Sequence, residues 1–326
     1  MDSSVRRPGL SEFDLISRFF TRAPRHATLG IGDDAALLAV SPECELTAST
    51  DMLVEGVHFF PDVDPQALGH KALAVNLSDL AAMGAMPRWA MLSLALPEAD
   101  VQWLEGFSRG FFALADKHGV DLVGGDTTLG PRNICVQIMG EVGRGMALRR
   151  DGAKVGDDIW VSGQLGDAAA AVAYRRGELK LDPPAYDRCR MRLDWPTPRV
   201  ALGLELTGCC HSAIDVSDGL LGDLAHICVR SRVGARIEYA AVPCSADLRP
   251  LRDETPGMRA ILAGGDDYEL CFTAAPERVV EIEALAKTLD IALTRIGRIV
   301  EGTTVSLFDA SGRPLPVKDK GFDHFR

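Results

Sequence analysis

The chain has 326 residues, which at ~150 residues per domain is enough for two domains with a core each and excludes a small fold held together by disulfides or a structural metal. Hydrophobic residues make up 47% of the chain and charged residues 25%, as in an average globular protein, and no apolar run approaches the ~18 residues of a membrane span. With 35 Lys and Arg against 46 Asp and Glu, the net charge of −11 argues against nonspecific binding to nucleic acid or to an anionic membrane.

The first half of the chain alternates between helical and strand periodicity. Ser11 is the expected N-cap of a short helix over 11–20, because its hydroxyl can accept a free backbone N–H. A longer helix is expected over 64–83, where Leu68, Ala72 and Val75 recur at steps of three or four and Asp79 projects near one end. Another helix is expected over 101–117, and strands are expected over 46–51, 89–96, 122–123 and 133–142.

Residues 144–158 combine small residues with mixed charge and are the expected domain boundary, which gives domains 1–148 and 149–326. The second domain is expected to begin with a strand over 159–162. Its other expected strands are 213–216, 235–239, 269–273 and 305–308, and its expected helices are 165–176, 199–207, 219–229 and 276–289. The sequence therefore predicts two mixed α/β domains.

The eight cysteines form no CxxC pair, and several stand in apolar runs such as 133–138 and 269–272. We expect them to be reduced core residues. Residues 1–10 are polar and lack the apolar segment of a secretory signal peptide. The expected location is the cytoplasm.

Six short motifs each place an aspartate at an expected turn, and most of them adjoin an expected strand. They are Gly-Asp-Asp at 32–34, Ser-Thr-Asp at 49–51, Asn-Leu-Ser-Asp at 76–79, Gly-Gly-Asp-Thr-Thr at 124–128, Asp-Val-Ser-Asp-Gly at 215–219 and Gly-Gly-Asp-Asp at 264–267. One such motif usually marks a turn or a helix N-cap, but six together favour a functional site. Converging carboxylates would repel one another without divalent cations between them, and Mg²⁺ takes oxygen ligands while leaving positions for phosphate oxygens.

Glycines beside these acids let backbone amides approach phosphate oxygens, and Asp218 and Gly219 open an expected helix whose N-terminus favours anions. The pattern indicates a nucleotide site. The P-loop, the GxGxxG fingerprint and the protein-kinase HRD and DFG motifs are absent, so the phosphate chemistry belongs to another fold. The seven histidines form no HExxH motif, which argues against zinc. His58 follows the 49–51 motif closely and either reaches the same site or serves the structure alone.

Seven segments carry a resemblance to a known family, in the same order and over nearly the whole chain. They are GIGDDAAL at 30–37, STDMLVEGVHF at 49–59, KALAVNLSDLAAMGA at 71–85, GGDTTLGP at 124–131, RDGAKVGD at 150–157, AIDVSDGL at 213–220 and GGDDYELCF at 264–272. This set resembles the thiamine-monophosphate kinase family of the AIR-synthase-like superfamily. NLSDLAAMGA and the tail at 321–325 are typical of this kinase rather than of its superfamily relatives.

The resemblance implies the AIR-synthase-like fold, with an N-terminal α/β domain that forms a homodimer through its sheet and a C-terminal α/β domain. It also implies that ATP is the co-substrate, held between the domains by several Mg²⁺ ions. Thiamine monophosphate is the implied substrate, and thiamine diphosphate is the implied product.

Site residues follow from the resemblance position by position. The implied metal ligands are Asp34, Ser49, Thr50, Asp51, Asp79, Asp126, Asp215 and Asp218, with Asp33 adjacent and behind the direct ligands. The implied ATP contacts are Gly125, Asp126, Arg150 and Ser217, although composition alone would make Arg150 a solvated loop charge. The implied substrate contacts are His58, Asp266 and Phe322. Asp266 departs from the family pattern, which has Glu there; the charge is kept and one methylene is lost.

Phosphoryl transfer depends mainly on positioning and on neutralising charge. We therefore expect Mg²⁺ held by Asp34, Asp51, Asp79, Asp126 and Asp215 to bridge the ATP phosphates and to orient thiamine phosphate for in-line attack. No general base is needed, because the attacking phosphate is already ionised at neutral pH.

Two alternatives remain open. A superfamily relative such as AIR synthase or selenophosphate synthetase would use ATP to activate an oxygen. The latter needs a cysteine or selenocysteine in a Gly-rich N-terminal segment, and the first cysteine here, Cys44, lies beyond that segment. A noncatalytic protein could instead use the acids to bind Ca²⁺ or to sense a nucleotide, although the EF-hand spacing is absent.

Overall fold

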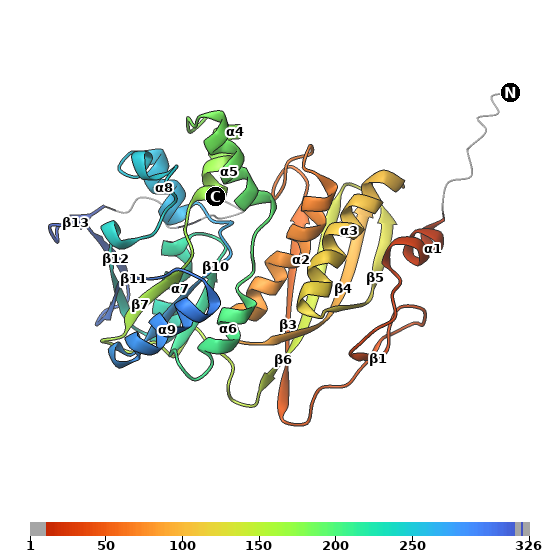
Figure 1. The fold of residues 1–326 in the computed structure, drawn as a ribbon, viewed down its shortest axis with the longest axis horizontal. Helices are drawn as coiled ribbons and strands as arrows, with labels where there is room; N and C mark the ends of the chain where they lie inside the picture. Colours follow the sequence, from red (N-terminus) through yellow and green to blue (C-terminus); the bar gives the residue numbers. More distant parts are fainter. Residues whose placement is uncertain (1–10, 317–320, 322–326) are drawn as a thin grey trace. The chain divides into compact units, whose positions relative to one another are not determined.

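The computed structural model describes residues 11–316 and residue 321. The chain divides into two compact units, one of Met1–Asn76 and Pro87–Glu141 and the other of Leu77–Met86 and Val142–Arg326. Each unit combines a β-sheet with helices (Figure 1), which confirms the mixed α/β class. The domain boundary between residues 148 and 149 stays a prediction.

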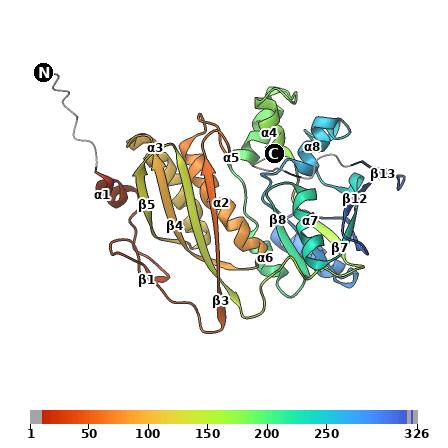
Figure 2. The same cartoon turned by 180° about the vertical axis from the view of Figure 1, so that it is seen from behind.

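The first unit is built on a four-stranded sheet in the order β3-β6-β4-β5. Its strands are β3 (Cys44–Val54), β4 (Met86–Leu96), β5 (Asp121–Leu129) and β6 (Asn133–Gly143). Helices α2 (Pro65–Ala82) and α3 (Val101–His118) cover one face of this sheet. Figure 2 shows the sheet from its other face, with the strands in front of the two helices. Trp89, Phe107 and Phe111 are fully buried in this core.

Helix α3 shows how the local sequence sets the bounds of an element. The carboxylate of Asp100 accepts hydrogen bonds from the amides of Gln102 and Trp103 and so caps the N-terminus, while Gly119 ends the helix in the left-handed conformation. Leu104, Phe107 and Phe111 recur at helical spacing and are buried. The capping residues and the spacing of the buried side chains therefore both define a single helix over these residues.

A short N-terminal segment leads into this unit. Ser11 and Asp14 form a capping box at α1 (Glu12–Leu15), which continues as a π-helical turn over Ile16–Phe20 before β1 (Ala27–Leu29) and β2 (Leu37–Leu38). The helix expected over 11–20 is thus present, α-helical at its start and π-helical over Ile16–Phe20.

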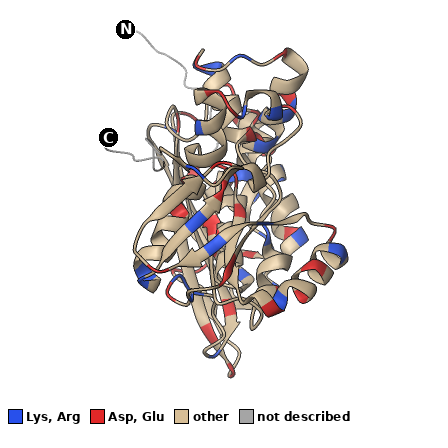
Figure 3. Cartoon of the chain, turned by 90° about the vertical axis from the view of Figure 1, so that its left-hand side faces the viewer, with Lys and Arg blue, Asp and Glu red and all other residues tan. Residues whose placement is uncertain are grey.

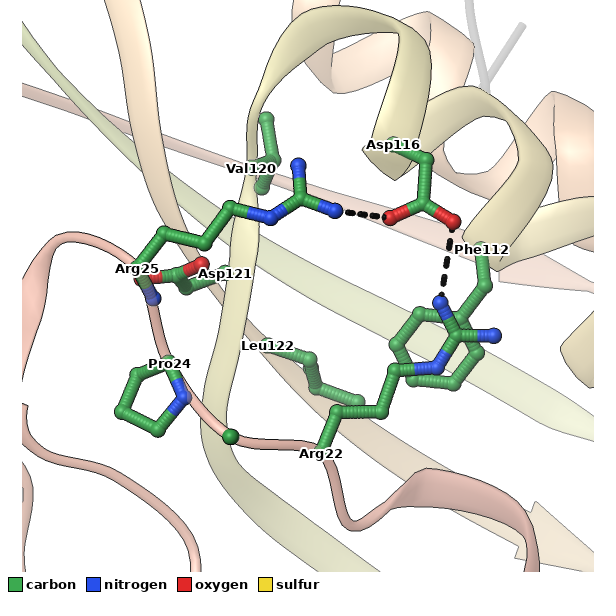
Figure 4. A pocket seen from close by; sticks show the side chains of 9 residues that line it. Arg22, Pro24, Arg25, Phe112, Asp116, Val120, Asp121 and Leu122 are labelled. Carbon is green, nitrogen blue, oxygen red and sulfur yellow. Dashed lines mark hydrogen bonds and ion pairs between the residues drawn. The ribbon is translucent and has the colours of Figure 1, made fainter.

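Asp121 attaches this segment to the sheet. Its Oδ2 accepts the amides of Arg25, His26 and Ala27 at 2.7, 2.5 and 3.2 Å. Beside it, Arg22 stacks over Phe112, and Arg22 and Arg25 both pair with Asp116 around a small hollow (Figure 4).

The second unit contains a seven-stranded sheet in the order β13-β12-β9-β11-β7-β10-β8. Its strands are β7 (Asp158–Ser162), β8 (Ser212–Val216), β9 (Gly234–Glu238), β10 (Glu269–Ala274), β11 (Leu293–Val300), β12 (Val305–Phe308) and β13 (Pro314–Leu315). Neighbours are antiparallel except for β9 and β12. Every residue of β7, β8 and β10 is buried, so these three strands form the centre of the core.

Six α-helices surround this sheet within the described residues. They are α4 (Asp167–Arg175), α5 (Pro183–Asp194), α6 (Val200–Leu206), α7 (Leu220–Ser231), α8 (Thr255–Ala263) and α9 (Val279–Leu289). Helix α7 packs against β8, β9 and β12, and α4 packs against α5 and α8. The loop between β8 and α7 is therefore held between two packed elements.

Charged residues of both signs are interspersed along the described elements (Figure 3). Buried Asp158, for example, pairs with Arg298 at 3.3 Å and Arg295 at 3.4 Å. The eight cysteines are free thiols, and five of them are buried. No helix among the described residues is both long enough and apolar enough to span a membrane.

Candidate active site

Four of the expected site aspartates lie inside regular elements rather than at turns. Asp51 lies in β3, Asp79 in α2, Asp126 in β5 and Asp215 in β8. Asp51, Asp79 and Asp215 fall within the elements expected over 46–51, 64–83 and 213–216, although their motifs were read as turns. The turn expected at Asp126 was wrong, because this residue lies within β5. A strand or helix fixes its side chains better than a loop does, which suits groups that must hold a set geometry.

Strand β3 separates Ser49 and Asp51 from Thr50. Residues 47, 49, 51 and 53 face α2, where they are half-buried or buried, while residues 46, 48, 50 and 52 are exposed on the other face. The Thr50 hydroxyl donates to the Val136 carbonyl at 3.1 Å on that other face. Thr50 can therefore join Ser49 and Asp51 in a metal site only through its main-chain carbonyl.

Asn76 on α2 holds the backbone of Asp51. Its Oδ1 accepts the amide of Asp51 at 3.1 Å, and its Nδ2 donates to the Ala72 carbonyl at 3.0 Å. Asn76 is 1% exposed, so this amide bridge is shielded from water. The sequence motif contained Asn76, but we did not assign it a role.

Gly125 and Asp126 follow an irregularity in the pairing of β5 with β4 and are themselves paired with Leu92 and Ser93. The register shifts between Ala90 and Met91, and Gly125 has a φ of +144°. A Cβ at Gly125 would lie 1.8 Å from the Leu92 carbonyl oxygen, so only glycine fits. Exposed Asp126 follows directly, and its Oδ1 accepts the Thr127 amide at 2.9 Å.

Asp33, Asp34 and His58 also belong to the first unit. Asp33 and Asp34 are exposed, and Asp33 Oδ1 accepts the Asp34 amide at 3.3 Å. His58 lies in the turn after β3, where its Nδ1 accepts the Val54 amide at 3.0 Å. The acceptor role of Nδ1 places the ring proton on Nε2 in the neutral imidazole.

In the second unit, Asp215 lies near Asp79 and Ser78. The Ser78 hydroxyl donates to Asp215 Oδ2 at 2.9 Å, and both residues are buried. Burial and the charge of Asp79 raise the pKa of Asp215 well above its usual range, while the Ser78 bond and the charge of Arg150 lower it. One acid and one arginine therefore act electrostatically on the buried carboxyl of Asp215.

Arg150 differs from its neighbour Arg149. Arg149 forms a two-point pair with Asp151, at 2.9 and 2.7 Å. Arg150 is exposed and lies close enough to Asp215 to lower the pKa of that carboxyl. The structure thus places Arg150, rather than Arg149, near an expected metal ligand.

Ser217 and Asp218 form the loop between β8 and α7, and their amides are already occupied. Asp223 Oδ2, one turn into α7, accepts the amides of Ser217, Asp218 and Gly219. Asp223 is 3% exposed, and it lies outside all six aspartate motifs of the sequence. Its position four residues after Gly219, in the first turn of the helix, was the available signal.

Asp266 lies on the adjacent loop with an unusual backbone. Gly265, Asp266 and Tyr268 have φ values of +73°, +62° and +50°. Asp266 Oδ1 accepts the Tyr268 hydroxyl at 2.9 Å, and the amide of Asp266 donates to the Ser217 carbonyl at 2.8 Å. Positive φ at two residues that are not glycine persists only where surrounding contacts enforce it, and such strain is concentrated at functional sites.

The tail of the chain comes close to the loop between β8 and α7 at Gly321. A Cβ at Gly321 would lie 3.1 Å from the carbonyl oxygen of Asp218. Phe322, the expected aromatic contact to substrate, lies outside the described residues.

Comparison with known proteins identifies the family. Residues 32–142 match the family AIR synthase related protein, N-terminal domain, and residues 154–310 match its C-terminal domain. The chain is 44% identical over 318 residues to thiamine-monophosphate kinase of Escherichia coli (strain K12), covering 96% of this chain and 98% of that protein. The chain belongs to the thiamine-monophosphate kinase family.

Solved structures of similar proteins agree with this assignment. Thiamine-monophosphate kinase from Stenotrophomonas maltophilia K279a is 51% identical with a TM-score of 0.82, covering 89% of this chain and 92% of that chain. A structure of AaThiL complexed with AMPPCP and TMP is 34% identical with a TM-score of 0.76, covering 90% and 92%. The AIR-synthase-like fold expected from the sequence is confirmed.

The residues that the thiamine-monophosphate kinase resemblance implied are distributed over both units. Asp33, Asp34, Ser49, Thr50, Asp51, His58, Gly125 and Asp126 lie in the first unit, and Asp79, Arg150, Asp215, Ser217, Asp218 and Asp266 lie in the second. Among the described residues, no three His, Cys, Asp or Glu side chains form a ready metal cluster.

The pair of Asp79 and Asp215 nevertheless fits a divalent cation. Its carboxylate oxygens are hard ligands, and the like charges that raise the pKa of Asp215 would be neutralised by Mg²⁺.

Proposed function

We propose that this chain transfers the γ-phosphoryl group of ATP to the phosphate of thiamine monophosphate, giving ADP and thiamine diphosphate. The observation that carries the proposal is 34% identity across 90% of the chain to a protein solved with AMPPCP and TMP. AMPPCP stands in for ATP because a methylene replaces the bridging oxygen between its β- and γ-phosphates. The two ligands together are the two substrates of this transfer.

We assign the metal sites to oxygen ligands on both units. The proposed ligands are Asp34, Ser49, Thr50, Asp51, Asp79, Asp126, Asp215 and Asp218, with Asp33 behind them. Bound Mg²⁺ would neutralise charge on the ATP phosphates. The burial of Asp215 and its proximity to Asp79 support this assignment for the second unit.

The other contacts divide between nucleotide and acceptor. Gly125, Asp126, Arg150 and Ser217 are the proposed ATP contacts, and His58, Asp266 and Phe322 are the proposed substrate contacts. Arg150 supplies a cation next to buried Asp215, and the Nε2–H of His58 supplies a hydrogen-bond donor. The strained backbone of Asp266 presents its carboxylate at a fixed angle.

The transfer needs positioning more than proton removal. The acceptor phosphate is ionised at neutral pH, so no residue is assigned as a general base. Asn76 keeps the backbone of Asp51 in place, and Ser78 orients the carboxylate of Asp215. These residues preserve the ligand geometry on which in-line attack depends.

We also propose a homodimer through the face of the four-stranded sheet opposite α2 and α3. Leu46 and Met52 of β3 and Met91 of β4 are exposed there, at 51%, 53% and 38%. An uncovered apolar sheet face is typical of an association surface. The proposed domains are 1–148, with metal and association functions, and 149–326. The eight free thiols support a reducing compartment, the cytoplasm.

A coupled assay of ADP release with and without thiamine monophosphate tests the reaction. We expect ADP only when both ATP and thiamine monophosphate are present, with thiamine diphosphate formed in equal amount and with no turnover in excess chelator. ADP release that depends on a different acceptor would indicate a superfamily relative that activates another oxygen. Nucleotide binding without ADP release would indicate a noncatalytic sensor.

A further inference from the structure

Asp223 satisfies three consecutive backbone amides with one carboxylate oxygen. Its Oδ2 lies 3.0 Å from the amide nitrogen of Ser217 and 3.1 Å from those of Asp218 and Gly219. The side chain is buried at the start of the 12-residue helix α7. The bonds from Ser217 and Asp218 are partly buried and that from Gly219 is buried. Amides shielded from water without such an acceptor would cost free energy, so this carboxylate fixes the loop conformation.

This arrangement changes the role expected for the N-terminus of α7. Free amides at a helix N-terminus attract phosphate, and we expected them to face the nucleotide. Here the amides of residues 217–219 donate to a side chain of the same helix. The amides of this loop are therefore used internally and are not free to bind phosphate.

The loop of Asp266 is built on the conformation of this first loop. The amides of Asp266 and Tyr268 donate to the carbonyls of Ser217 and Val216, each at 2.8 Å. Gly265 lies so close that a Cβ would be 2.4 Å from the Ser217 carbonyl oxygen. A shift of Ser217 would therefore move the backbone of Asp266.

We propose that Asp223 is a positioning residue that sets the Ser217–Gly219 loop and, through it, the loop of Asp266. The inference rests on the proposed function, because Ser217 and Asp218 are its ATP and metal contacts and Asp266 its substrate contact. Asp223 acts through these residues and does not itself touch substrate. Its loss should weaken binding of the metal–nucleotide complex and of thiamine monophosphate together.

Kinetics of Asp223→Ala and Asp223→Asn test the role. Asp223→Ala removes the carboxylate that accepts the three amides. In this variant we expect the Mg²⁺ concentration for half-maximal activity and the KM values for ATP and thiamine monophosphate each to rise at least about fivefold. Asparagine keeps an acceptor oxygen at the same position and should bring all three values back to within about threefold of the wild type. Calorimetric titration with Mg²⁺ and AMPPCP gives the nucleotide affinity without turnover.

Asp121 provides a matched control. It is also buried, and one of its carboxylate oxygens also accepts three consecutive amides, those of Arg25, His26 and Ala27. None of those three residues is an expected site residue. Asp121→Ala should lower the melting temperature while the Mg²⁺ requirement and both KM values stay within twofold of the wild type.

Two results would overturn the inference. One is a folded Asp223→Ala variant with wild-type Mg²⁺ requirement and KM values. The other is an equal rise of these constants in Asp121→Ala. If Asp223→Ala does not fold, Asp223→Glu replaces it: its longer side chain displaces the carboxylate, and wild-type constants there would contradict the role. Wild-type protein without thiamine-dependent turnover would instead contradict the proposed function, and the calorimetric comparison would still decide the role of Asp223.

Discussion

Aspartate side chains serve three different purposes in this chain, and their surroundings decide which. Asp121 and Asp223 accept backbone amides and hold a segment in place. Asp158 is buried beside two arginines that compensate its charge. Asp215 is buried near Asp79, a group of the same charge. Burial and nearby acids raise the pKa of Asp215 and of Asp223 alike, but Asp223 is compensated by three backbone amides and Asp215 by the Ser78 hydroxyl and the charge of Arg150. An acid buried beside another acid, as Asp215 is, is typical of a ligand site.

Asp215→Asn should therefore separate activity from stability. The substitution keeps the side-chain shape and removes a buried negative charge, so the melting temperature in excess chelator should be unchanged or higher. Activity should fall about 100-fold or more, corresponding to ~2.7 kcal/mol of lost transition-state stabilisation. Thermal unfolding in chelator and kcat at saturating Mg²⁺ measure the two effects.

The control for Asp215→Asn is Asp167→Asn. Asp167 is also buried, and burial raises its pKa, but it accepts hydrogen bonds from Ser245 and Cys189 and lies in no expected site. Near-wild-type activity is expected there. A fully active Asp215→Asn enzyme at limiting Mg²⁺ would remove Asp215 from the ligand set.

His118 should make the protein less stable in mild acid. Burial, with the nearby charges of Lys117 and His70, lowers the pKa of His118 to about 4, and its Nε2 has no hydrogen-bond partner among the described residues. The unfolded chain binds this proton near pH 6.5 and the folded protein only near pH 4. The contribution of His118 to stability is thus fully present above pH 6.5 and is lost as the pH falls towards 4.

Urea unfolding of wild type and His118→Gln at pH 7.5, 6.0 and 4.5 measures this effect. The free energy of unfolding of the variant should rise relative to the wild type as the pH falls, because glutamine does not titrate. Parallel pH profiles for the two proteins would contradict the lowered pKa.

At the scale of elements, one buried ion pair joins three parts of the second unit. Arg199, at the N-terminus of α6, pairs with Glu269 of β10, with Nε to Oε2 at 2.6 Å, and Ser162 of β7 donates to the same carboxylate. The two charged side chains are only 13% and 7% exposed. Removing one partner of such a pair leaves a buried charge uncompensated.

Glu269→Leu should lower the free energy of unfolding by about 3 kcal/mol, and Arg199→Met combined with Glu269→Leu should recover much of that loss. Urea unfolding of both single variants and the double variant measures the coupling. The exposed pair of Arg18 and Glu105 is the comparison, where Glu105→Leu should cost less than about 1 kcal/mol. Additive single effects at 199 and 269 would show that the pair is not coupled.

The elements with strong periodicity or clear caps could be predicted from the sequence. Helices α2 and α3 and strands β3, β4 and β6 lie within a few residues of their expected bounds. Helix α5 was missed because its composition is polar, although Asp182 caps it and Pro183 begins it. Strand β11 was missed because a register shift at Arg295 and Gly297 interrupts its alternation.

The site could be predicted only in part, for physical reasons. Residue types and motifs identified acids suited to Mg²⁺, and their roles stay predictions. The supporting residues Asn76 and Asp223 accept hydrogen bonds from backbone amides. A sequence does not show which backbone amides will lack a main-chain partner in the fold and need a side-chain acceptor. Asp126 was interpreted as a turn residue because Gly124 and Gly125 precede it, whereas its pairing with Ser93 of β4 keeps it in β5.

At the scale of the whole molecule, the exposed sheet face gives a testable association state. Leu46→Glu with Met52→Glu places two charges on the proposed dimer face, on side chains that point away from α2. Sedimentation should show a dimer for the wild type and a folded monomer for the variant. A wild-type monomer at micromolar concentration, or a dimeric variant, would exclude this face as the interface.

The alternation of side chains between the two faces of β3 limits where members of the family can carry insertions or deletions. Residues 49 and 51 face the helices and residues 46, 50 and 52 face away, so inserting one residue early in the strand would exchange the two sets. The carboxylate of Asp51 would then emerge on the bare side of the sheet and Met52 on the helix side. Single insertions and deletions should therefore be tolerated before Cys44 or after Val54, and within β3 only as pairs.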